Sequence, residues 1–103
     1  MNLPKWLILW VWQALIGEIY PEIRAIALRY DPDKNLLIRY YFDREPTDDD
    51  LEYIECVITN IWANTSSSDQ IRDIEVETIF TEKKMGVLDA LDGLVYARRE
   101  YSL

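Results

Sequence analysis

The stretch EIRAIALRYDPDKNLLIRYYFD, residues 22–43, contains two strand-like runs separated by a short turn. Both runs are rich in β-branched and aromatic residues, which favour extended structure. Between them, Asp31 and Pro32 suit the first two positions of a type I turn, and Asn35 tolerates the left-handed conformation. The stretch therefore predicts a β-hairpin over residues 22–43.

The second run of the hairpin also predicts which side chains face the core. Successive side chains of a strand point to opposite faces of the sheet. The apolar set, expected on the core face, is Leu36, Ile38, Tyr40 and Phe42. The mixed set, expected on a face that is solvated or contacts a partner, is Leu37, Arg39, Tyr41 and Asp43.

Helices are expected on both sides of the hairpin in the sequence. The apolar segment at about 4–19 predicts a first helix, which Pro21 would stop. Residues 47–63 predict a second helix, because apolar side chains recur there at helical spacing. Thr47 is a natural N-cap, with Asp50 at the capping-box position. The expected core stripe is Leu51, Ile54, Ile58 and Ile61, widened by Val57 and Trp62.

Two further strands complete the expected sheet. The third is DIEVETIF, residues 73–80, and its inward set is Ile74, Val76, Thr78 and Phe80. A short helical turn is expected in VLDALDG and a last strand in LVYARRE. We therefore expect one α+β domain over residues 1–103. Its element order is α-β-β-α-β-β, and its four-stranded sheet is mainly antiparallel and packed against helices.

The composition argues against several classes of ligand and chemistry. The 103 residues carry 19 acids against 11 bases, a net charge of −8, whereas nucleic acids and anionic membranes attract basic surfaces. The chain has no histidine and no Gly-rich phosphate loop. Glycosidase-type chemistry would need an acid whose pKa is raised by burial, and the acids here look solvated. We expect no enzyme activity, cofactor, metal, nucleic acid or membrane contact.

The single cysteine and the N-terminal tryptophans bear on location and assembly. Cys56 can form no internal disulfide, which favours a reducing cytoplasm, and its apolar neighbours predict a buried thiol. The start WLILWVWQALIG is shorter than the roughly 20 residues that span a bilayer. Its tryptophans do not share one helical face, so burial within the fold and exposure in a homodimer contact both remain open. They are Trp6, Trp10 and Trp12.

The run FDREPTDDDLEYIE, residues 42–55, sets seven carboxylates against one Arg44. A metal site is disfavoured, because neighbouring helix positions such as Asp48 and Asp49 do not converge on one point. Acids in the first turn of a helix interact favourably with its dipole, and each contributes roughly 0.3–1 kcal/mol of stabilisation. One or two acids are enough for this effect. The excess is either a solvated face or a docking surface for a basic partner, and the sequence leaves both open.

The docking hypothesis assigns partner binding to two groups of residues. Tyr53 lies among the helix acids, and aromatic side chains beside charges are typical of binding hot spots. The first group is Asp43, Glu45, Asp48, Asp49, Glu52, Tyr53 and Glu55. The second, on one face of the third strand, is Asp73, Glu75 and Glu77. The alternative for this second group is cross-strand pairing with Arg24, Arg39 or Arg98.

Three segments together resemble small, acidic immunity proteins of bacterial contact-dependent growth inhibition and related polymorphic toxins. They are ALIGEIYPEIRAIALRY, LLIRYYFDREPTDDDLEYIECVITNI and LDGLVYARREY. The resemblance implies a cytoplasmic inhibitor that binds one cognate toxin domain, often a nuclease, whose cationic groove would suit an acidic inhibitor. The alternative is a homo-oligomeric structural or adaptor domain that uses its Trp-rich helix.

Overall fold

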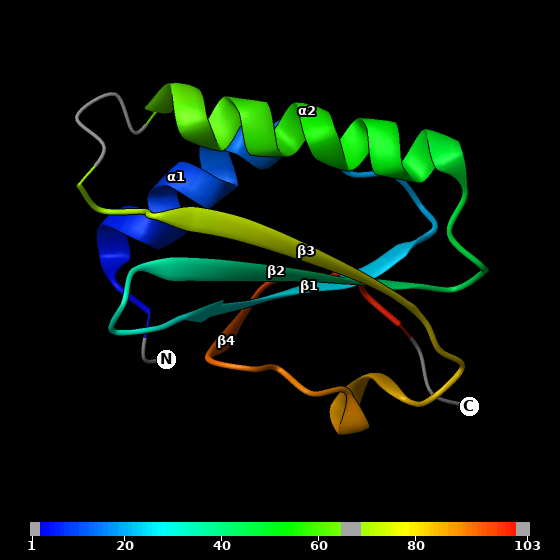
Figure 1. The fold of residues 1–103 in the computed structure, drawn as a ribbon. Coiled ribbons are helices and arrows are strands. Elements are labelled where there is room, and N and C mark those ends of the chain that lie inside the picture. The colour runs from blue at the N-terminus through cyan, green and yellow to red at the C-terminus, as the bar shows by residue number, and fades with distance from the viewer. Residues whose placement is uncertain (1–2, 65–68, 101–103) are drawn as a thin grey trace.

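A computed structural model describes residues 3–64 and 69–100 of the chain (Figure 1). Two helices cover one face of a four-stranded sheet, which confirms the α+β class and the order α-β-β-α-β-β. The helices are α1 (Lys5–Leu15) and α2 (Asp48–Asn64), with a short 3-10 turn η1 (Met85–Val87). The strands are β1 (Ile23–Tyr30), β2 (Asn35–Phe42), β3 (Asp73–Phe80) and β4 (Gly93–Ala97).

The sheet has the order β3-β2-β1-β4, and it is mainly antiparallel as expected, although one of its three strand pairings is parallel. β1 pairs antiparallel with β2 and β4, whereas β2 and β3 are parallel from Asn35 and Asp73 to Phe42 and Phe80. α2 carries the chain back along the sheet, so β3 starts beside the start of β2 (Figure 1). The predicted hairpin is confirmed, although Lys34 and not Asn35 is left-handed.

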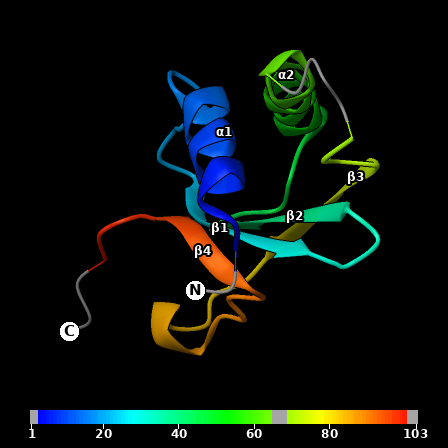
Figure 2. The ribbon, with the colours of Figure 1, turned by 90° about the vertical axis from the view of Figure 1, so that its left-hand side faces the viewer.

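The main core lies between the helices and the sheet (Figure 2). All four β2 side chains expected on the core face are buried. On α2 the expected stripe is partly wrong, because Leu51 is 47% exposed and Trp62 is also exposed. Among the α2 side chains that the structure describes, the buried ones are Asp50, Ile54, Val57 and Ile61. The predicted buried thiol is wrong as well, since Cys56 lies on the exposed side of α2.

β3 is less buried than its apolar alternation predicted. Ile74, Val76 and Thr78 are only half-buried, and Phe80 is exposed. β3 forms one edge of the sheet, so it has a neighbouring strand on one side only. The side chains of β3 that face the helices are therefore less completely buried than those of a central strand.

Part of the face of the sheet opposite the helices is covered by the segment 81–92 (Figures 1 and 2). Tyr41, expected on a solvated or partner-binding face, is buried here, and its hydroxyl donates to the carbonyl of Asp89 at 2.7 Å. The helical turn expected in VLDALDG lies instead at η1. A small apolar cluster results, formed by Ala25, Ala27 and Tyr41 with Ile79, Met85, Leu88, Leu91 and Leu94.

α1 is shorter than predicted and leaves part of its apolar surface exposed. It ends well before Pro21, because Gly17 adopts a left-handed conformation with φ of 78°. As expected, the tryptophans do not share one buried face. Trp6 and Trp10 are half-buried, with ring centroids 4.7 Å apart. Trp12 is 50% exposed, and its indole N–H donates to the carbonyl of Val95 at 2.9 Å.

Candidate partner-binding surface

The N-terminus of α2 is fixed by the predicted capping box. The backbone N–H of Thr47 donates to Asp50 Oδ2 at 2.7 Å, and the backbone N–H of Asp50 donates to Thr47 Oγ1 at 3.3 Å. These reciprocal bonds satisfy backbone donors that a helix start leaves without partners. The local pattern TDDD therefore sets where the helix begins.

Asp50 is the one buried carboxylate of the acidic run, and it is held by residues from two other segments. Arg44 donates to it at 2.6 and 3.1 Å, and the Tyr20 hydroxyl donates at 2.5 Å. The Arg44 hydrogen bonds lower the pKa of Asp50 well below its usual range, against the opposing effect of burial. Burial, together with the hydrogen bond to Asp50, raises the pKa of Tyr20. Asp50 is thus a structural anion that is not available to a partner.

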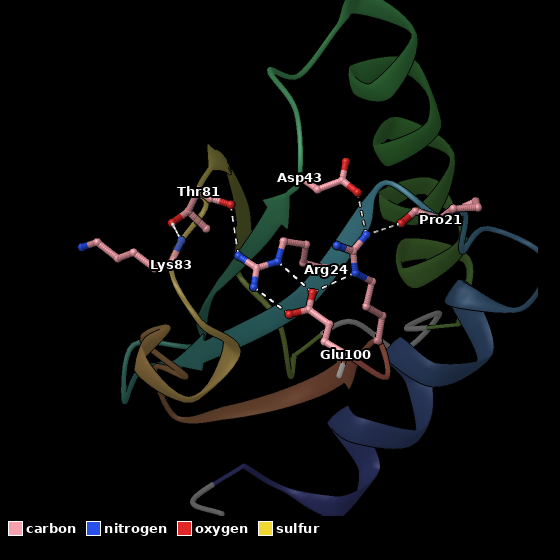
Figure 3. Close-up of polar contacts among 7 residues, drawn as sticks. Pro21, Arg24, Asp43, Thr81, Lys83 and Glu100 are labelled. Carbon is pink, nitrogen blue, oxygen red and sulfur yellow. Dashed lines mark hydrogen bonds and ion pairs between the residues drawn. The ribbon is translucent and has the colours of Figure 1, made fainter. Parts of the chain in front are cut away.

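Asp43 belongs to a second internal network, at the ends of β1 and β2 (Figure 3). Arg98 donates to Asp43 at 2.6 Å and to Glu100 at 2.8 Å. Glu100 also accepts two hydrogen bonds of 2.8 Å from the buried Arg24 (Figure 3). The bonds from Arg24, followed by those from Arg98, lower the pKa of Glu100 to about 2. This network ties the chain after β4 to β1, and Asp43 is partly neutralised within it.

The other acids of the run are exposed and form no ion pair within residues 3–64 and 69–100. Asp48, Glu52 and Glu55 follow one side of α2 at spacings of four and three residues, so they share a helical face. Glu45 precedes the helix, and Asp49 follows Asp48 directly in the first turn of α2. We call these five residues the α2 acidic surface: Glu45, Asp48, Asp49, Glu52 and Glu55.

An open hollow of about 590 Å³ lies beside this surface, between the start of α2 and the residues that follow α1. Asp49 and Tyr53 line it from α2, and Glu18, Tyr20 and Glu22 line it from the other side. The rings of Tyr20 and Tyr53 meet edge to face, with centroids 5.5 Å apart. The sequence did not predict this grouping, because residues 18–22 come near α2 only through the tertiary fold.

The second predicted group lies on the other face of the sheet from α2. Arg39 pairs with Glu77 across the β2–β3 register at 3.2 Å, which bears out the cross-strand alternative for that residue. Asp73 and Glu75 are exposed and form no ion pair in the described part of the chain. The structure therefore does not bring the two predicted groups together into one patch.

A family model described as MafI2 immunity protein matches residues 4–100. The chain belongs to the MafI2 immunity protein family. MafI proteins are immunity proteins of polymorphic toxins, so membership confirms the predicted resemblance and assigns toxin neutralisation to the chain. No curated protein has a sequence that matches this one.

Two features, a metal site and a membrane-spanning helix, are absent from the described residues of this MafI2 chain. No three Asp, Glu, Cys or His side chains in the two described ranges are grouped as a metal site requires. Neither described helix is long and apolar enough to cross a membrane. The candidate site consists of the α2 acidic surface and the adjoining hollow.

Proposed function

We propose that this chain neutralises its cognate toxin by docking the α2 acidic surface on a basic region of the toxin. The single observation that supports this is the group of five exposed carboxylates that form no ion pair within the two described ranges. A nuclease is the toxin class that fits best, because its phosphate-binding groove must be cationic. In this proposal the chain is a cytoplasmic binding protein without enzyme activity, and the exposed thiol of Cys56 fits a reducing compartment.

The physical basis is electrostatic attraction between oppositely charged surfaces. The five acids repel one another in the free protein, and a basic partner would relieve that repulsion on binding. Complementary charges also steer the two proteins together, which can raise association rates to roughly 10⁸–10⁹ M⁻¹s⁻¹ at low salt. Tyr53, beside these acids and 48% exposed, offers an aromatic contact within the same surface.

The test compares two triple variants that change the net charge equally. Asp48→Asn/Glu52→Gln/Glu55→Gln removes three charges from the α2 acidic surface, and Asp33→Asn/Asp69→Asn/Glu82→Gln removes three exposed acids elsewhere. We expect the first to slow association with the toxin domain encoded by the neighbouring gene by roughly three- to tenfold at low salt. The second should change the rate far less. Equal effects of the two variants would show that net charge, and not this surface, governs binding.

The exposed apolar side of α1 supports a second candidate function, self-association. Leu9, Trp12 and Ile16 recur at helical spacing, and Ile16 is 78% exposed. The contact would involve these residues and not Trp6 or Trp10, which pack against the core. Sedimentation should then show a dimer that the Leu9→Ser/Ile16→Ser variant converts to a monomer. A wild-type monomer at high concentration would remove this candidate.

A further inference from the structure

The two edges of the sheet are protected to different degrees. β4 is a five-residue strand with an irregular register, and the carbonyl of Val95 accepts the Trp12 indole N–H. β3 is an eight-residue strand that pairs with β2 along its whole length without a bulge. No strand in the described ranges pairs with its other side. β3 therefore presents a long, regular and open edge, which natural proteins usually cover or shorten.

The hydrogen bond just beyond β3 shows which backbone groups face this open edge. The N–H of Thr81 donates to the carbonyl of Phe42 in β2 at 3.1 Å. Along a strand, alternate residues direct their N–H groups to the same side, and the β2–β3 register has no shift. Glu75 and Glu77 therefore direct their N–H groups toward β2, whereas Val76 and Thr78 direct theirs toward the open edge.

The side chains of β3 add a charge pattern to this backbone template. On the face opposite the helices, Asp73 and Glu75 are exposed and form no ion pair in the part of the chain that the structure describes. On the helix face, Ile74 and Val76 are half-buried. A strand laid against β3 would thus meet acids on one face and apolar side chains on the other.

We propose that the cognate toxin adds a strand to the open edge of β3. The added strand would alternate cationic side chains, opposite the acids, with apolar side chains. It would extend over up to about 26 Å, the length of eight residues. Main-chain hydrogen bonds supply affinity in such strand addition, and alternate side chains supply specificity. This inference rests on the proposed toxin-binding function and adds a second contact region to it.

The charge pattern favours a toxin strand over a second copy of this chain. If two copies joined through β3 about a two-fold axis perpendicular to the sheet, their acidic rows would lie on the same face, opposite each other. Like charges directly opposite on neighbouring strands are destabilising. A cationic strand from a basic toxin would instead form favourable cross-strand pairs with the same row.

Amide hydrogen exchange tests the inference without altering the protein. Exchange is followed residue by residue in the wild-type chain, free and bound to the toxin domain encoded by the neighbouring gene. We expect binding to slow exchange at Val76 and Thr78 by at least about tenfold, while Glu75 and Glu77 are already protected in the free chain. A complex that leaves Val76 and Thr78 unchanged would overturn strand addition and leave toxin binding intact. Absence of any complex would overturn both.

A matched pair of variants at one position gives a second test. Thr78→Pro removes an N–H that faces the open edge without removing a bond to β2, and Thr78→Ala keeps that N–H. We expect the proline variant to bind the toxin domain about tenfold or more weakly than the alanine variant. Melting curves establish that both variants are folded, and if the proline variant is not, the exchange experiment decides. Equal affinities of two folded variants would contradict the inference.

Discussion

The inner and outer sides of the first turns of α2 use the same residue type for opposite purposes. Asp50, on the inner side, is fully buried and held by Arg44 and Tyr20. Asp48 and Asp49, its immediate neighbours, are exposed and form no ion pair within the described ranges. Three consecutive aspartates therefore divide into one structural anion and two surface charges. The difference shows that charge in a sequence becomes available for binding only where the fold leaves it unpaired.

The largest effect is expected from placing a new charge on the inner side. Ile54→Asp would bury a carboxylate in the core without a partner, which should cost several kcal/mol and unfold the chain. Cys56→Asp adds the same side chain on the exposed side and should leave the protein folded. Circular dichroism and urea unfolding measure both. A folded Ile54→Asp variant would contradict the helix register.

A smaller loss is expected from removing the buried charge itself. Asp50→Asn weakens the hydrogen bonds from Arg44 and Tyr20, so the free energy of unfolding should fall by about 2–3 kcal/mol. The neighbouring Asp49→Asn, on the exposed side, should change it by no more than about 0.5 kcal/mol. Urea unfolding at neutral pH compares the two. Similar values would contradict the division between the inner and outer sides.

The acid dependence of stability should separate paired from unpaired carboxylates. In the folded chain the pKa of Glu100 is about 2, against an ordinary value of 4.5, and the pKa of Asp50 is lowered too. Because the folded values are the lower ones, both carboxylates stabilise the fold above their ordinary pKa values. This contribution is lost as the pH falls toward 2. The free energy of unfolding, measured by urea unfolding, should therefore fall as the pH is lowered over that range. It should fall less steeply for the variant Asp50→Asn/Glu100→Gln than for the wild type. An equally steep loss in this variant would assign the acid sensitivity to other groups.

The parts of the fold that depend on neighbouring residues could be predicted from the sequence. The hairpin, the core face of β2 and the capping box all arise from patterns within a few residues, and the structure confirms them. The parallel pairing of β2 with β3 could not be predicted, because it depends on where α2 returns the chain. The same limit applies to the half-burial of β3, which follows from its place at the edge of the sheet.

In the α2 stripe and the candidate site, too, features that depend on tertiary contacts could not be predicted from local sequence patterns. Leu51 has the helical spacing of a core residue, yet the helix turns so that Asp50 faces inward in its place. The partners of Asp50 lie in separate segments, and Tyr20 is thirty positions away in the sequence. The exposure of the α2 acids was predicted, because the run contains more carboxylates than the first turn of a helix requires for dipole stabilisation. The ion pair between Asp43 and Arg98 was not predicted, because the two residues meet only in the folded chain.

Calorimetry of the chain with the toxin domain encoded by the neighbouring gene, at low and at high salt, tests the central claim most directly. Exposed charges that attract across an interface are screened beyond about 10 Å at 0.1 M salt, so docking through the α2 acidic surface requires salt-sensitive affinity. We predict tight binding at low salt that weakens markedly at high salt. Tight binding that does not change with salt would contradict docking through this surface.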